Sequence, residues 1–259
     1  MKSVIIVTGA SSGLGAEFAK QLANRNADEL WIIARREDKL KQVAQEISKI
    51  SNITVKIITE SIQGSTAYNR FKELFNEEII IDTLVNNAGF GTYGPFEETP
   101  IQAQLDMIDL NVNALTAICG AALPYLKEGS RIINVASLAA FSPLGNFSVY
   151  AATKSYVYSF SLSLAAELKD KGIKVIAVCP GSVSTEFANV ASNGARKEVL
   201  GGKPADKTVQ HALKQLDKGK KVALMAFVWK MKAFLSRFIG HYFFARYSYL
   251  HHKRPYKHD

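Results

Sequence analysis

A glycine-rich turn close to the N-terminus constrains the fold more than any other feature of this chain. Residues 4–7 are a short β-branched run, which is typical of a strand buried on both faces. The sequence TGASSGLG follows at residues 8–15, and a helical pattern begins at Ala16. Glycines let the backbone turn sharply toward a pyrophosphate, and the helix N-terminus offers it free N–H groups. Although the spacing is not G-x-G-x-x-G, a strand, a glycine turn and a helix in this order predict a dinucleotide site.

The second predicted strand, residues 29–34, ends in Arg35 and Arg36. At this position an Asp or Glu would accept hydrogen bonds from the ribose 2′-hydroxyl of NAD, whereas an Arg suits the 2′-phosphate of NADP. We therefore expect NADP (NADPH) in preference to NAD, with Arg35 as the main contact and Arg36 as a weaker second. The alternative is a solvated basic pair at the end of a strand.

Helical and extended patterns continue to alternate after this strand. The sequence predicts helices over 37–50 and 64–76, and strands over 54–59 and 83–85. The strand over 83–85 opens into the motif NNAG at residues 86–89, and buried asparagines there must be hydrogen-bonded. This alternation predicts an α/β fold: a doubly wound parallel sheet of Rossmann type with about seven strands, flanked by helices.

A tyrosine and a lysine mark the second half of the chain. Tyr150 and Lys154 lie one helical turn apart in a helix predicted over 148–168, so both side chains leave the same face. A phenol has an ordinary pKa of about 10, and a neighbouring ammonium group lowers it. A tyrosine tuned in this way can act as a general acid or base. Packing of the ring on the lysine stem is the alternative interpretation.

The remaining elements complete the predicted sheet. We expect one long helix over 101–126, and strands over 131–135, 173–179 and 221–227. Ser137 follows the strand over 131–135, at the carboxyl edge where ligands bind in open α/β sheets.

At this point the sequence closely resembles the short-chain dehydrogenase/reductase family. The matching motifs occur in the family's order and approximate spacing: TGASSGLG at 8–15, NNAG at 86–89, Asn111, Ser137, YAATK at 150–154, and a proline-glycine pair with a threonine at 180–185. The resemblance covers residues 3 to about 185 closely, and extends to about residue 226 in general layout.

The resemblance implies a role for each matching residue. Tyr150 would be the general acid/base, Ser137 would hold the substrate oxygen, Lys154 would bind the nicotinamide ribose and lower the Tyr150 pKa, and Asn111 would complete a proton relay. The expected cofactor-binding residues are Gly9, Ser11, Ser12, Gly13, Leu14, Gly15, Arg35, Arg36, Asn87, Ala88, Gly89, Tyr150, Lys154, Pro180, Gly181, Val183 and Thr185.

These roles imply an NADP(H)-dependent enzyme that interconverts a carbonyl and an alcohol by hydride transfer. Residues 185–204 correspond to the family's substrate loop, and their sequence indicates no particular substrate. We also expect a homodimer or homotetramer. The alternative is a non-catalytic dinucleotide-binding protein, regulatory or at a membrane surface, against which the intact Ser137, Tyr150 and Lys154 argue.

The C-terminal segment differs from the rest in charge. Residues 218–259 hold ten Lys and Arg and one acidic residue, which accounts for the whole net charge of +9. We expect one domain, with 1–228 as its oxidoreductase part and 229–259 as a helical extension. Apolar residues in the extension recur at the spacing of one helix face: Met231, Phe234, Leu235, Phe238, Ile239 and Tyr242.

Two uses of this basic, aromatic-rich segment are open. It can lie on an anionic membrane surface, or it can pack on its own domain or on a partner subunit. We expect the second, near the substrate loop, because a sheet edge needs covering. No motif supports nucleic-acid binding, and no metal site is expected.

Location follows from apolar patterning and cysteine content. The longest unbroken apolar run, residues 222–229, is far below the approximately 20 residues of a membrane span. Cys119 and Cys179 lie in apolar contexts and are expected to be free thiols. We therefore expect a cytoplasmic protein.

Overall fold

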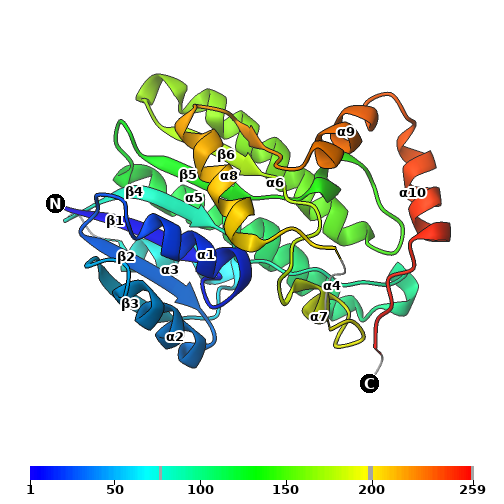
Figure 1. The fold of residues 1–259 in the computed structure, drawn as a ribbon, viewed down its shortest axis with the longest axis horizontal. Coiled ribbons are helices and arrows are strands. Elements are labelled where there is room, and N and C mark those ends of the chain that lie inside the picture. Colours follow the sequence, from blue (N-terminus) through cyan, green and yellow to red (C-terminus); the bar gives the residue numbers. More distant parts are fainter. Residues whose placement is uncertain (76–77, 198–200, 258–259) are drawn as a thin grey trace.

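The computed structural model describes residues 1–75, 78–197 and 201–257 (Figure 1). One parallel sheet runs through it in the strand order β3-β2-β1-β4-β5-β6-β7. Its strands are β1 Lys2–Thr8, β2 Glu29–Ala34, β3 Thr54–Thr59, β4 Ile79–Asn86, β5 Arg131–Val135, β6 Lys174–Val178 and β7 Val222–Ala223. The order reverses between β1 and β4, so the carboxyl ends of these two strands flank a crevice of the kind that binds ligands. The expected doubly wound parallel sheet is confirmed.

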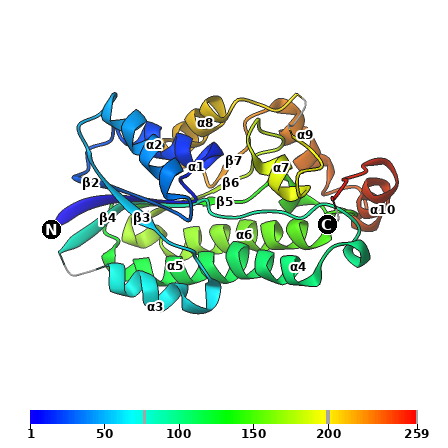
Figure 2. The same cartoon turned by 90° about the horizontal axis from the view of Figure 1, so that it is seen from below.

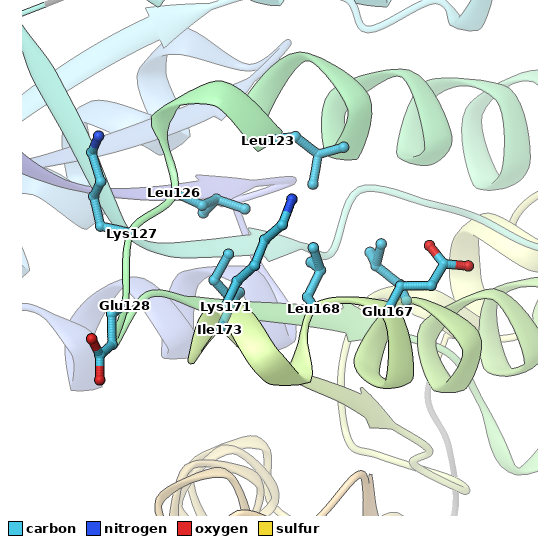
Figure 3. Close-up of a pocket in the computed structure, with 9 residues that line it drawn as sticks. Leu123, Leu126, Lys127, Glu128, Glu167, Leu168, Lys171 and Ile173 are labelled. Atoms are coloured by element: carbon cyan, nitrogen blue, oxygen red, sulfur yellow. The ribbon is translucent and has the colours of Figure 1, made fainter.

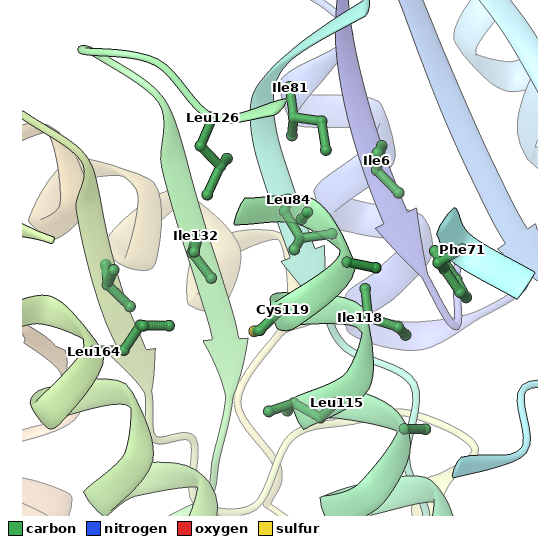
Figure 4. Close-up of a cluster of buried hydrophobic side chains, with 14 of the residues drawn as sticks. Ile6, Phe71, Ile81, Leu84, Leu115, Ile118, Cys119, Leu126, Ile132 and Leu164 are labelled. Carbon is green, nitrogen blue, oxygen red and sulfur yellow. The ribbon is translucent and has the colours of Figure 1, made fainter. Parts of the chain in front are cut away.

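Helices cover both faces of the sheet (Figure 2). One face packs against α1 Gly13–Leu22, α2 Glu37–Ser48 and α8 Ala205–Asp217. The other packs against α3 Gly64–Leu74, α5 Leu115–Ala122 and α6 Ser148–Glu167. Because side chains alternate along a strand, each strand feeds both cores: Ile6 and Leu84 enter the core under α5, shown in Figure 4, whereas Ile5 and Val85 enter the opposite one.

The long helix expected over 101–126 is divided into segments. It consists of α4 Ile101–Ile108, a π-helical segment Asp109–Ala114 and α5, and it ends in a 3₁₀ turn at Tyr125. Within the described ranges it is the one helix long and apolar enough to cross a membrane by length and composition. In this structure its α5 part instead lies on the sheet, where Leu115 and Ile118 belong to the core.

The seventh strand is shorter than the expected 221–227. Only Val222 and Ala223 pair with β6, through the N–H groups of Ala177 and Cys179, which donate to the carbonyls of Lys221 and Ala223. The pairing of the two strands ends at Val178 and Ala223. The backbone then leaves the sheet, and α9 Phe227–Leu235 begins where a strand was expected to end.

The C-terminal extension contains two helices rather than one. After α9, the chain breaks its helical path at Gly240 and resumes as α10 His241–His251. Trp229 and Ala233 are buried, but Phe227, Phe238 and Tyr242 are 77%, 73% and 81% exposed. The aromatic face is therefore not buried against its own domain, because α9 packs with its opposite face inward. The other expectation, that this face packs on a partner subunit, stays a prediction.

Candidate active site

Glycines shape the turn between β1 and α1. A Cβ atom at Gly15 would collide with the carbonyl oxygen of Gly9 and with the amide nitrogen of Asn87. Gly9 itself has a φ of 65°, and a Cβ there would lie 2.8 Å from the Ala88 Cα. The turn thus fits directly against the NNAG segment, and only glycine allows that approach.

Hydrogen bonds join the glycine turn to the NNAG segment. The Asn87 side-chain amide donates to the carbonyls of Thr8 and Gly9, at 3.1 and 3.2 Å. The Thr8 hydroxyl donates to the Val85 carbonyl and accepts from the N–H groups of Asn87 and Ala88. Asn87 therefore holds the loop and does not point freely into the crevice, as expected for a partly buried amide at a strand end.

The N-terminus of α1 is open for an anion. Its first residue follows Ser12, whose side chain makes no capping hydrogen bond, so N–H groups of the first turn are left for a ligand. The Arg36 guanidinium lies over this turn and donates to the Ser11 and Ser12 hydroxyls at 3.3 and 2.8 Å. Charge-assisted donors and a helix N-terminus together fit a phosphorylated dinucleotide.

The two adjacent arginines are not equivalent in the structure. Arg36 also pairs with Glu186 at 2.9 Å, which links the glycine turn to the substrate loop and lowers the Glu186 pKa. Arg35, the residue that the sequence analysis placed first, is exposed at the end of β2. The structure therefore brings the second arginine, and not the first, to the glycine turn.

Ser137 and Tyr150 meet at the carboxyl end of β5. Ser137 caps the short 3₁₀ turn that follows it by accepting from the Ala139 N–H at 3.1 Å, and its hydroxyl donates to the Pro180 carbonyl at 3.5 Å. The Ser137 hydroxyl also acts on the Tyr150 phenol and lowers its pKa, against the larger effect of burial. Tyr150 lies in the first turn of α6. The predicted pair of polar groups is thus brought together by two elements whose sequence positions are thirteen residues apart.

Lys154 lies one turn further along α6, as expected, but its ammonium group is bound elsewhere. It donates to the Val135 carbonyl at 2.8 Å and lies 5.7 Å from the centroid of the Tyr150 ring. Burial lowers the pKa of Lys154 to about 8, because the site removes water from the charged form. A Cβ at Gly89 would lie 3.5 Å from the Lys154 nitrogen, so this glycine borders the same space.

The pKa of Tyr150 departs from the expectation. Burial raises it well above the ordinary value, and the hydrogen bond with Ser137 only partly opposes this effect. The spacing of Tyr150 and Lys154 in the sequence predicts the opposite direction, a pKa lowered by the ammonium group. In this structure the apolar surroundings dominate, because the ammonium group rests on the Val135 carbonyl and not on the phenol oxygen.

Asn111 holds two parts of the site together from within the π-helical segment, a feature often found at functional sites. Its side-chain amide donates to the Phe90 carbonyl at 2.9 Å and to the Thr153 hydroxyl at 3.1 Å, and its oxygen accepts from the Phe90 N–H. These bonds fix the end of the NNAG loop against α6. The relay role that the resemblance implies stays a prediction.

Aromatic rings enclose Tyr150, and no motif in the sequence predicts them. Phe147 stacks on its ring with centroids 4.1 Å apart, and Phe187 lies at 5.4 Å. Tyr93 meets Phe147 edge-on at 4.8 Å. A Cβ at Gly91 would lie 2.8 Å from the Phe147 ring, so this position needs a glycine. The second glycine of NNAGFG is therefore the one feature of the sequence that relates to this packing.

The expected cofactor residues after β6 lie on the far side of the glycine turn. Thr185 approaches Gly13, where a Cβ would lie 3.2 Å from its side chain. Gly181 lies against the indole of Trp229, so the extension covers this end of the segment. Val183 forms an isolated parallel bridge with Lys203, which joins the two ends of the substrate loop.

The extension also borders the substrate loop, as expected. Within this loop, α7 Phe187–Ala191 carries Phe187, and residues 198–200 lie outside the described residues. The Ser192 carbonyl accepts from the Lys257 N–H, and the Asn193 side chain donates to the Lys257 carbonyl. The extension is also bonded to the segment before α6, where the Asn146 side chain donates to the carbonyls of Tyr249 and His252.

A pocket between α5 and the end of α6 lies at the amino edge of the sheet, away from these residues (Figure 3). Apolar and charged side chains line it, among them Leu126, Glu128, Leu168 and Lys171. No catalytic candidate contributes to it. Among the described residues, no group of three or more His, Cys, Asp or Glu could hold a metal ion.

Comparisons with known proteins agree with this geometry. The sequence profile of short chain dehydrogenases matches residues 3–196. An uncharacterized oxidoreductase of Staphylococcus epidermidis is 32% identical over 217 residues, which is 83% of this chain and 92% of that protein.

Two solved structures show the same architecture. A short-chain dehydrogenase from Sphingobium yanoikuyae in complex with NADPH aligns with a TM-score of 0.76 and 27% identity, over 91% of this chain and 93% of that one. The bulky-bulky ketone specific alcohol dehydrogenase from Comamonas testosteroni aligns with a TM-score of 0.73 and 25% identity, over 92% of each chain.

Proposed function

This chain belongs to the short-chain dehydrogenase family, and on that premise we propose that it is an NADP(H)-dependent enzyme that interconverts a ketone or aldehyde and the corresponding alcohol. Its class, an oxidoreductase acting on alcohols and ketones, is that of its relatives. The observation that carries the proposal is the grouping of Tyr150 and Lys154, one turn apart on α6, with Ser137 after β5, at the same edge of the parallel sheet as the uncapped N-terminus of α1.

The side chains present divide the proton chemistry among themselves. Ser137 and Tyr150 offer hydroxyl groups that can hold one carbonyl oxygen, and the phenol gives its proton to that oxygen as the alcohol forms. Lys154 would bind the ribose hydroxyls of the dinucleotide instead of the Val135 carbonyl. The reduced nicotinamide supplies the hydride when it is bound. Because the Tyr150 ring is enclosed by Phe147 and Phe187, water has little access to the reacting oxygen.

Arg36 supports NADP(H) as the cofactor. Its guanidinium already lies on the Ser11 and Ser12 hydroxyls, where a ribose 2′-phosphate would meet a bidentate donor. The related structure from Sphingobium yanoikuyae contains NADPH.

The rings around Tyr150 favour a carbonyl carried by an apolar group. Phe147, Phe187 and Tyr93 surround the phenol. An apolar substrate would contact these rings in place of the contacts that the rings make with one another. The structural relative from Comamonas testosteroni is specific for bulky-bulky ketones. We propose an aromatic or alicyclic ketone as the substrate class.

Location and assembly are proposals as well. Cys119 and Cys179 are free and buried, which supports a reducing, cytoplasmic location. Ile101 and Leu105 of α4 are exposed apolar residues, which supports a homodimer or homotetramer that packs through this helix.

A substrate panel tests the activity. The protein is mixed with NADPH and a series of aldehydes and ketones, and NADPH oxidation is followed by its absorbance. We expect turnover with bulky ketones, and none with Tyr150→Phe under the same conditions. Absence of NADPH oxidation with every compound, while NADPH still binds, would favour the alternative of a non-catalytic dinucleotide-binding protein.

A further inference from the structure

The outward face of α9 is apolar along its whole length. Trp229, Ala233 and Ser236 are buried, and they lie on one side of the helix and its following turn. At about 100° per residue, the opposite side carries the exposed apolar residues Phe227, Val228, Met231, Phe234, Leu235 and Phe238. This arrangement inverts that of an ordinary surface helix, which turns its polar side to water.

Basic residues flank this apolar face on both sides. Lys230 and Arg237 are seven residues apart, so they lie along one border of the face, and Lys232 lies along the other. All three are exposed. An apolar stripe bordered by Lys and Arg is the pattern of a helix that lies in a lipid interface, with its long cationic side chains reaching the headgroups.

The second helix of the extension continues the pattern. In α10, Ser248 faces inward and donates to the Gly145 carbonyl, while Phe243, Tyr247 and Leu250 are exposed on the other side with Arg246. The rings of Phe243 and Tyr247 stack with centroids 6.1 Å apart. Figures 1 and 2 show α9 and α10 side by side at the same end of the molecule.

The positive charge of the extension indicates which kind of partner binds the exposed faces of α9 and α10. None of the ion pairs found among the described residues includes a Lys or Arg from 218–257. A two-fold contact between two copies would set these uncompensated cations against one another, because the same patch faces itself. An anionic partner removes that repulsion, and a partner that also accepts many flat and branched apolar side chains is a lipid bilayer.

We propose that α9 and α10 form a docking surface for an anionic lipid bilayer. The apolar residues enter the acyl boundary, and the flanking cations meet phosphate headgroups. The inner side of α10 is bonded to Gly145 and Asn146, next to the Phe147 ring that stacks on Tyr150, so docking places the rim of the active site close to the lipid. The proposal does not depend on which carbonyl the enzyme reduces.

Vesicle sedimentation with the full chain tests the proposal. The probes are vesicles of phosphatidylcholine alone and of phosphatidylcholine with phosphatidylglycerol. We expect sedimentation with the anionic vesicles only, weakened when salt rises from about 0.05 M to about 0.5 M because the cations are screened. The double variant Phe234→Ser/Phe238→Ser and the double variant Lys230→Glu/Lys232→Glu should each reduce the bound fraction at least about tenfold.

Matched controls come from the far end of α2. Ile50 is 51% exposed, close to the 53% of Phe234, and Lys49 is exposed beside it. Ile50→Ser and Lys49→Glu should bind vesicles like the wild type, and melting curves check that every variant is folded. Three results would overturn the proposal: no sedimentation of the wild type with anionic vesicles, equal binding by the α9 variants, or a change of oligomeric mass in those variants with no vesicle binding, which would make this face an interface between copies.

Discussion

The glycine-turn region and the C-terminal extension place their side chains in opposite environments. At the carboxyl edge of the sheet, polar side chains are buried and hydrogen-bonded: Asn134 accepts from Asn86 and donates to Ser161. In the extension, large apolar side chains such as Phe238 are in solvent. A buried amide without a partner is costly, so these hydrogen bonds restrict how the first region can pack, although the Asn86 Oδ1 itself has no partner among the described residues. The second region has no such constraint within this chain, and its composition is explained by a partner outside it.

The family comparison divides the chain in the same way. The profile of short chain dehydrogenases covers residues 3–196 and stops before α8, so the extension lies outside it. The shared part carries the predicted catalytic and cofactor residues, whereas the extension contributes Trp229, Ser248 and Arg254 to the walls around them. The family profile therefore covers the predicted reaction centre, and the extension adds to the walls around it.

The largest expected effect concerns the catalytic region. Tyr150→Phe should lower kcat by about 10²–10⁴-fold, because the proton donor is removed while the ring and its stacking on Phe147 remain. NADPH affinity, measured by fluorescence titration, should change little. Tyr156→Phe is the control, since Tyr156 lies on the same helix with its hydroxyl bonded to Thr116 on the outer surface. If Tyr150→Phe keeps about a third or more of the wild-type kcat, Tyr150 is not the acid.

Two substitutions on α9 sharpen the contrast between its faces. Trp229→Ala should reduce the free energy of unfolding by about 3 kcal/mol, because the indole is 6% exposed and packs on Gly181. Phe238→Ala should change it by less than about 0.5 kcal/mol, because the ring is in solvent. Urea denaturation of both variants measures the difference. Similar losses for the two would show that the outward face is covered within the folded protein.

Cofactor choice tests which arginine matters. The wild type should bind NADPH at least about tenfold more tightly than NADH, since a charge-assisted hydrogen bond contributes about 1.5–3 kcal/mol. Arg36→Ala should narrow this ratio mainly through NADPH affinity, because Arg36 lies on Ser11 and Ser12. Arg35→Ala is the neighbouring control and should have a smaller effect. Equal affinities of the wild type for NADPH and NADH would show that neither arginine contacts the 2′-phosphate. A larger effect of Arg35→Ala than of Arg36→Ala would show that Arg35 makes this contact.

The smallest expected effect is a pH dependence of stability that arises from Lys154. Its pKa is lowered to about 8 in the folded protein from 10.5, so the folded state loses the proton first as pH rises. Between these pH values the unfolded state binds more protons, and the free energy of unfolding increases with pH. From about pH 8 to about pH 9.5 the wild type should gain about 1–2 kcal/mol relative to Lys154→Met.

The difference in the free energy of unfolding between the wild type and Lys154→Met isolates the contribution of Lys154. Burial raises the pKa of the Cys119 and Cys179 thiols to about 12, and it raises that of Tyr150 as well. These groups lower stability at high pH in both proteins, so most of their contribution cancels when the urea midpoints are compared. A difference that does not change with pH would mean that Lys154 keeps its proton throughout this range.

Much of the fold followed from short-range patterns in the sequence. Strands β1 to β6, the glycine turn and the helix with Tyr150 and Lys154 one turn apart were predicted at the right places, although β4 Ile79–Asn86 is longer than the expected 83–85. Each of them depends on residues close together in the chain. The predicted length of β7 was wrong, because the neighbouring strand decides it: the pairing with β6 ends at Val178 and Ala223. The rings of Phe147, Phe187 and Tyr93 come from separate segments, and no local pattern brings them together.

The sequence by itself determined the motifs, their order along the chain and the apolar stripe of the extension. Only the tertiary structure decided that Arg36 reaches the glycine turn, that burial sets the pKa of Tyr150, and that the stripe faces solvent. The physical reason is the range of the forces involved. Helical periodicity fixes which residues share a face of a helix. The desolvation of a side chain, its hydrogen bonds to residues far away in the sequence, and the direction in which the helix face points all depend on packing against distant parts of the chain.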